Sequence, residues 1–141
     1  MAAAVPRVTL LVGSACLLAC VSDPPTTTRV LPSGRQIEVI SVGVVGDADG
    51  RWVLEYRTLL PITPHERLQC EVEAIWSDVK GEAENAGVRR AGIWPTSFDH
   101  ELRWVGWRPV MLGQMMTAFS LERDGQGGWR KAGGWSATPC P

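Results

Sequence analysis

The stretch Thr63-Pro64-His65-Glu66-Arg67-Leu68, which continues to Gly87, decides the fold of this 141-residue chain. Thr63 supplies an N-cap hydroxyl, Pro64 suits the first helical position, and Glu66 completes a capping box. Apolar residues then recur at helical spacing, with Trp76 on the flank, until Gly87 provides a C-cap. The apolar residues are Leu68, Val72, Ile75, Val79, Ala83 and Ala86. This pattern predicts one amphipathic helix that buries this face in the core; a stripe that binds a partner is the alternative.

Two β-rich runs precede the helix, over residues 35–46 and 51–60. In the second run Trp52, Leu54 and Tyr56 alternate with polar residues, which is typical of a half-buried strand. The segment Asp47-Ala48-Asp49-Gly50 between them favours a turn. A calcium loop would need a longer run of oxygen ligands and a distal glutamate, which this segment lacks. The two runs therefore predict a β-hairpin.

Strand-like sequence returns after the helix. Val88–Trp94 reads as a strand that Pro95 ends, residues 96–101 as a polar loop, and residues 103–112 as ambiguous. Residues 114–123 alternate, with one face made of Met115, Thr117, Phe119 and Leu121, and a short closing strand begins at Trp129. The order ββ-α-βββ predicts an α+β domain: an antiparallel sheet of about five strands with one amphipathic helix on one face.

The N-terminal segment has the order of a secretory signal peptide. Arg7 is followed by an apolar run over residues 8–19, then by Cys20 and a polar, proline-bearing stretch. The apolar run is too short for the roughly 20 residues of a membrane-spanning helix. The four residues Leu17-Leu18-Ala19-Cys20 resemble the lipobox of bacterial lipoproteins, in which the cysteine is acylated. A plain cleaved signal peptide without a lipid is the alternative.

The resemblance to bacterial lipoproteins implies several acyl chains, such as palmitate, on Cys20 and a stable membrane anchor in the cell envelope. It divides the chain into a signal peptide (1–19), a lipidated N-terminus with a Pro/Thr-rich tether (20–34) and one domain (35–141). An extended tether of this length would reach roughly 40 Å. The domain resembles many small envelope lipoproteins in general shape only, so no functional residue is transferred to it.

The cysteines predict one disulfide bond. Cys16 leaves with the signal peptide and Cys20 takes the lipid, so Cys70 and Cys140 remain. Two cysteines in an exported domain favour a disulfide over a metal site. Such a bond would hold the tail after Gly133 across the outer side of the helix; two unpaired thiols are the alternative.

Composition and motifs narrow the function classes. The chain has 14 Lys and Arg against 15 Asp and Glu, without a run of like charges, so we expect no nucleic-acid partner. The sequence has no Cys-x-x-Cys pair, and neither His65 nor His100 has ligand spacing, so we expect no metal and no cofactor. Neither histidine lies in a catalytic signature, and the helix glutamates read as solvated side chains, so we expect no enzyme.

Two candidate sites remain. Trp104 and Trp107 lie between Arg103 and Arg108, and an exposed ring there could contact a sugar, a lipid headgroup or an envelope protein. If this segment is a strand, the two rings point to opposite faces. The sequence thus favours a membrane-anchored, non-catalytic interaction or structural module. The alternative is a small ligand-binding protein or hydrolase with a pocket near Asp99 and His100.

Overall fold

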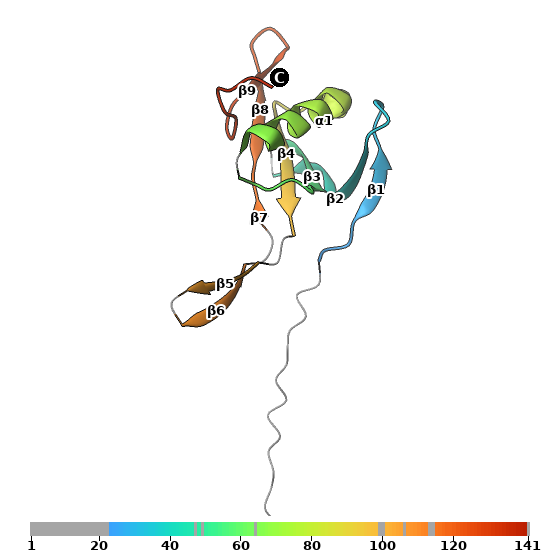
Figure 1. Cartoon of the computed structure of the whole chain (residues 1–141). Helices are drawn as coiled ribbons and strands as arrows, with labels where there is room; N and C mark the ends of the chain where they lie inside the picture. Colours follow the sequence, from blue (N-terminus) through green and yellow to red (C-terminus); the bar gives the residue numbers. More distant parts are fainter. Residues whose placement is uncertain are drawn as a thin grey trace, which may run out of the picture.

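The computed structural model describes residues 23–46, 48, 50–63, 65–98, 101–105, 107–112 and 115–140. One helix and nine strands follow one another along this part of the chain (Figure 1). In chain order they are β1 (Thr27–Val30), β2 (Gln36–Val45), β3 (Arg51–Arg57), α1 (His65–Asn85), β4 (Arg90–Ser97), β5 (Glu101–Val105), β6 (Arg108–Leu112), β7 (Met115–Met116), β8 (Phe119–Arg123) and β9 (Trp129–Lys131).

The main sheet has seven strands in the order β1-β2-β3-β4-β8-β9, with β7 paired to β4. The predicted α+β class with one helix is confirmed. The prediction of an antiparallel sheet of about five strands is wrong in part, because β3 and β4 are parallel and the sheet is mixed. The connection between β3 and β4 is α1, which at 1.5 Å per residue spans about 30 Å. It returns the chain to the end where β3 began, so β4 runs in the same direction as β3.

The helix α1 covers one face of the main sheet (Figure 1). Its predicted apolar stripe is buried in the core, as the sequence indicated; it comprises Leu68, Val72, Ile75, Val79 and Ala83. Ala86 is exposed because the helix ends at Asn85. Gly87 ends α1 as predicted: its φ of 69° is left-handed, and its N–H donates to the carbonyl of Glu84 at 3.0 Å.

The predicted hairpin of β2 and β3 is also confirmed. The two strands pair antiparallel, with Val39 opposite Tyr56 and Val44 opposite Trp52. The three alternating residues of β3 are buried. The expected alternation over residues 114–123 is interrupted between β7 and β8, so Phe119 is buried whereas Met115 is exposed. The closing strand β9 pairs with β8 as predicted.

The segment predicted as a tether belongs largely to the domain. β1 pairs antiparallel with β2, and Leu31 is buried in the core. The domain boundary predicted at residue 35 is therefore too late. The prolines do not prevent pairing, because Pro24 and Pro25 precede β1 and Pro32 follows it. The β-branched residues of β1 suit a strand at the edge of the sheet.

Pro95 does not end its strand, contrary to the prediction. On one side of β4 the ladder with β8 ends at Ile93, and pairing with β7 resumes at Thr96. The carbonyl of Pro95 faces this interrupted side, where it accepts from the N–H of Thr117 at 3.2 Å. The donor that proline lacks would thus point into the gap between two ladders, which makes a proline tolerable in this central strand.

The ambiguous segment forms a second, two-stranded antiparallel sheet of β5 and β6. In this hairpin Val105 pairs with Arg108, so Trp107 belongs to the turn. The hairpin projects from the main sheet beyond the end of β4 (Figure 1).

Candidate functional site

The structure places the predicted site residues in different ways. Cys20, Asp99 and His100 lie outside the described residues, so lipidation and the pocket near Asp99 stay predictions. Trp104 is in β5, whereas Trp107 is in the turn and 79% exposed. The segment is therefore not a single strand, so the condition for placing the two rings on opposite faces of a strand is not met, because the chain reverses direction between them.

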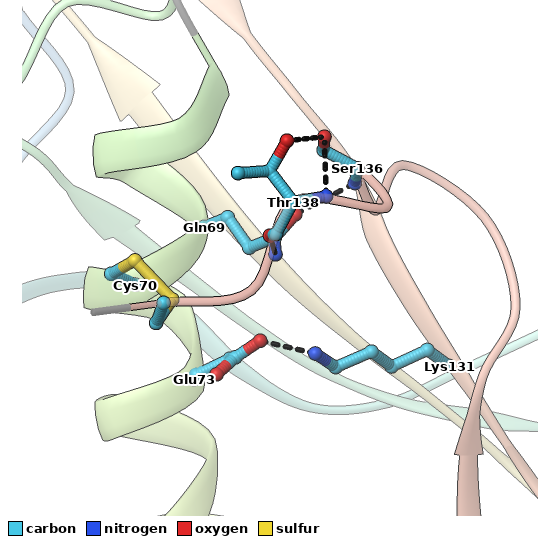
Figure 2. The surroundings of a disulfide bond; sticks show 7 residues. Gln69, Cys70, Glu73, Lys131, Ser136 and Thr138 are labelled. Carbon is cyan, nitrogen blue, oxygen red and sulfur yellow. Dashed lines mark hydrogen bonds and ion pairs between the residues drawn. A yellow bond between two sulfur atoms is a disulfide. The ribbon is translucent and has the colours of Figure 1, made fainter.

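A disulfide joins Cys70 of α1 to Cys140 near the end of the chain (Figure 2), as the cysteine pattern predicted. The two Cα atoms are 5.4 Å apart, which lies within the usual range for a disulfide. The bond holds the tail against α1 at the helical turn that contains Cys70, near the N-terminal end of the helix. Sequence and structure agree on this link between two elements far apart in the chain.

A buried side chain beside the disulfide binds the tail as well. Gln69 is only 1% exposed, and its amide nitrogen Nε2 donates to the carbonyl of Thr138 at 3.0 Å. Its Oε1 accepts from the N–H of Ser136 at 2.6 Å (Figure 2). One amide side chain thus supplies both partners that the irregular backbone of the tail needs. The sequence analysis missed Gln69, since a glutamine at this position of a helix carries no distinguishing signal.

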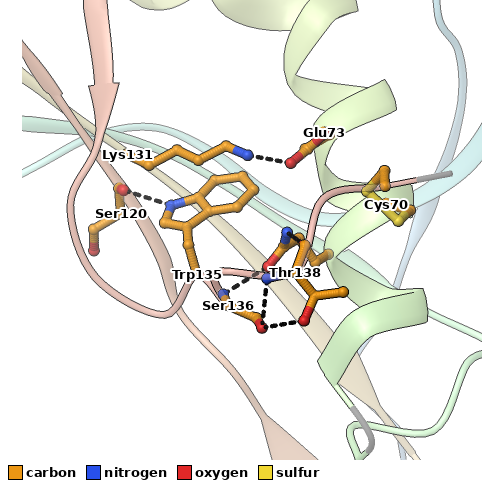
Figure 3. A network of polar contacts seen from close by, with 9 residues as sticks. Cys70, Glu73, Ser120, Lys131, Trp135, Ser136 and Thr138 are labelled. Atoms are coloured by element: carbon orange, nitrogen blue, oxygen red, sulfur yellow. Dashed lines mark hydrogen bonds and ion pairs between the residues drawn. A yellow bond between two sulfur atoms is a disulfide. The ribbon is translucent and has the colours of Figure 1, made fainter.

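Trp135 attaches the tail to β8. Its ring packs edge-on against Phe119, with ring centres 4.9 Å apart. Its Nε1 donates to the carbonyl of Ser120 at 2.8 Å (Figure 3). The ammonium of Lys131 lies 4.7 Å from the ring centre and also pairs with Glu73 of α1. Tail, sheet and helix are therefore joined around one indole ring.

Tryptophans line a shallow groove between α1 and the end of the sheet. Trp76 of α1 and Trp129 of β9 pack edge to face, with their ring centres 5.2 Å apart. With Trp135, Leu121 and the charged pair of Glu73 and Lys131 they line a volume of about 280 Å³. Three half-buried rings on one surface are able to contact an apolar or sugar-like group.

Four glutamates of α1 contact other elements, which the expectation of solvated side chains did not include, although those of Glu73, Glu82 and Glu84 stay partly exposed to solvent. Glu82 pairs with Arg29 of β1, and Glu73 with Lys131 of β9. Glu84 accepts from the Nε1 of Trp129 at 3.2 Å. The fourth, Glu71, accepts from two side chains at the end of β3. The polar side of α1 therefore fastens the surrounding strands to the helix.

Glu71 lies in a cleft of about 340 Å³ between α1 and the ends of β2 and β3. Its Oε1 accepts from the hydroxyl of Tyr56 at 2.7 Å and from that of Thr58 at 2.9 Å. Burial raises the pKa of Tyr56 above its usual value, and the negative charge of Glu71 raises it further. Tyr56 therefore stays a neutral hydrogen-bond donor. Arg35 and Arg57 also line this cleft.

Within the described residues, no helix is both long and apolar enough to cross a membrane. Among the same residues, no three His, Cys, Asp or Glu side chains are arranged to hold a metal ion.

Comparison with known proteins gives no match: neither a family model, nor a curated sequence, nor a solved structure matches this chain.

Proposed function

We propose that this chain is an exported lipoprotein, attached to a membrane through Cys20, whose folded part is a non-catalytic structural or interaction module. The anchor is inferred from the resemblance of residues 17–20 to a lipobox. Several acyl chains on one cysteine would hold the protein at a membrane permanently, because each buried methylene contributes about 0.8 kcal/mol.

The Cys70–Cys140 disulfide is the observation that carries the proposal. Disulfides form and persist in oxidising compartments, whereas the reducing cytosol keeps thiols free. A chain that begins with a signal-like segment and folds with a disulfide is suited to the cell envelope. The disulfide links the tail to α1, and we expect this link to stabilise the domain.

The polar side chains of α1 support the non-catalytic part of the proposal. Gln69, Glu73, Glu82 and Glu84 each bind a strand or the tail. In these contacts the side chains hold elements of the domain together, which is a structural role. The surfaces that remain for a partner include the groove of Trp76, Trp129 and Trp135, which fits an interaction module.

Cys20→Ser tests the proposal, with Cys16→Ser as the matched control. We expect Cys20→Ser to abolish incorporation of labelled palmitate and to leave the precursor uncleaved, because the acceptor sulfur is lost. Cys16→Ser should change neither property. Mass spectrometry of the wild-type chain checks the same point directly: an unmodified mature chain in the soluble fraction would contradict lipidation.

Small-ligand binding is a second candidate function, favoured by the cleft at Tyr56 and Glu71. Its volume of about 340 Å³ falls within the range of small-molecule sites, and its lining includes two carboxylates, the neutral hydroxyl of Tyr56 and two guanidinium groups. A thermal-shift screen with small organic acids and sugars tests it, because a ligand that binds only the folded state raises Tm. Asp99 and His100, near which the sequence predicted a pocket, lie outside the described residues.

A further inference from the structure

One end of the main sheet brings together the start of the described chain and the base of the β5–β6 hairpin. A carboxylate oxygen of Asp23 lies 3.9 Å from the guanidinium of Arg57, the last residue of β3. The same guanidinium stands 5.3 Å from the ring centre of Phe98, which directly follows β4. We call this end, defined by Asp23, Arg57 and Phe98, the entry end.

Exposed apolar side chains gather at the entry end. Leu59, just after β3, is 92% exposed, and the neighbouring N–H of Thr58 donates to the carbonyl of Thr96 at 2.9 Å. Met115 and Met116 of β7 pair with the last residues of β4, and both are exposed. An accumulation of large exposed apolar residues at one end of a domain marks an interaction site.

The hairpin that leaves the entry end has apolar residues at most of its paired positions. Residues paired across the two strands share a face, which places four apolar residues on one side: Leu102, Trp104, Pro109 and Met111. The register positions of the other face combine three charged residues, Glu101, Arg103 and Arg108, with three apolar residues, Val105, Val110 and Leu112. The exposed Trp107 occupies the turn, at the tip that points away from the sheet (Figure 1).

We propose that the entry end rests on the surface of the membrane that holds the lipid anchor, with Leu59, Trp107, Met115 and Met116 in the headgroup region. This inference rests on the proposed function. Cys20 precedes Asp23 by three residues, and at about 3.3–3.6 Å per residue this span reaches only about 10 Å. An acylated Cys20 therefore keeps Asp23, and with it the entry end, close to the lipid.

The chemistry of the entry end suits a bilayer containing anionic lipids. Tryptophan favours the interface between water and hydrocarbon, where its ring is partly apolar and its N–H meets water. The transfer of methionine and leucine side chains from water to the same depth of the bilayer is also favourable in free energy, because apolar surface leaves water. Arg103 and Arg108, against the single acidic residue Glu101, leave the hairpin with a net positive charge, and anionic headgroups attract a basic residue near their surface with about 1 kcal/mol.

The test places one fluorescent unnatural amino acid at position 59 or, as the matched control, at position 44. Val44 is 52% exposed and lies in the other part of β2, opposite Trp52 near the start of β3. Each full-length lipidated chain is reconstituted into vesicles of phosphatidylcholine and phosphatidylglycerol that contain a nitroxide-labelled lipid. We expect several-fold stronger quenching at position 59 than at position 44. Thermal melting of both chains confirms that they fold.

The outcomes separate this inference from the proposed function. Equal quenching at both positions in a chain whose acyl mass is present overturns the membrane contact alone. A wild-type chain that lacks the acyl mass overturns the proposed function and this inference with it. With the label at position 115 instead, weaker quenching in a Leu59→Ser/Trp107→Ser chain than in the chain without these two substitutions would support the contact through these side chains.

Discussion

Gln69 shows how a single side chain substitutes for regular backbone pairing. The carbonyl of Gly133 still accepts from the N–H of Ser120 in β8 at 2.8 Å, but the tail from there to residue 140 forms no strand. Gln69 offers a donor and an acceptor at once, and it meets Thr138 and Ser136 two residues apart. Its burial protects both hydrogen bonds from competition with water.

Gln69→Leu should destabilise the domain by about 1–3 kcal/mol for each tail group that loses its partner. The leucine fills a similar volume, but the N–H of Ser136 and the carbonyl of Thr138 become unsatisfied. Urea unfolding measures the loss in free energy, and amide exchange at Ser136 reports its location.

Arg67→Leu is the control for this change, because it introduces the same side chain at an exposed position of α1. It should alter the free energy of unfolding far less. Equal stability of the two variants would show that the amide of Gln69 does not hold the tail.

At the scale of elements, α1 packs against different partners on different sides. One face buries the stripe from Leu68 to Ala83 under the sheet. Another binds the tail through Gln69 and Cys70, and the glutamates bind β1, β3 and β9. Because one helix touches so many elements, damage to its buried face should lower the stability of the whole domain.

Val72→Ala and Ile75→Ala should each lower the free energy of unfolding by about 2–5 kcal/mol, since each leaves a cavity in the core. Both side chains are fully buried. Urea denaturation measures the effect, and Lys80→Ala at an exposed position of α1 provides the baseline. If the free energies of unfolding of both variants equalled that of the Lys80→Ala chain, this would contradict the core position of this face.

At the scale of the whole molecule, the disulfide joins positions 70 residues apart in the chain. The enclosed segment contains most of α1 and every strand from β4 to β9. In the unfolded chain such a link restricts this long segment, while in the folded domain Gln69 and Trp135 already hold the tail in place.

Cys70→Ser/Cys140→Ser should therefore cost about 4 kcal/mol of stability while the tail stays docked. Urea unfolding measures the loss, and amide exchange at Ser136 should remain slow in the folded variant. Wild-type protein treated with a reductant should match the double variant. Identical unfolding of oxidised and reduced wild-type chains would contradict a stabilising role for the bond.

Local patterns in the sequence determined the features that depend on near neighbours. The helical spacing from Leu68 to Ala83 predicted the buried face of α1, and the alternation around Leu54 predicted the β2–β3 hairpin. The pairing of Cys70 with Cys140 followed because only these two cysteines remained in the expected mature chain. Each of these inferences needed only side-chain polarity at fixed spacing, or residue identity.

Only the tertiary structure decided the features that depend on distant partners. The direction of β4 beside β3, the pairing of β1 with β2 and the place of Pro95 inside a strand all depend on which strand lies alongside. The role of Gln69 depends on a tail that is far away in the chain and has no pattern of its own. Periodicity reports which side of an element is buried, but a hydrogen bond or a strand neighbour is set by three-dimensional proximity, which short-range sequence does not encode.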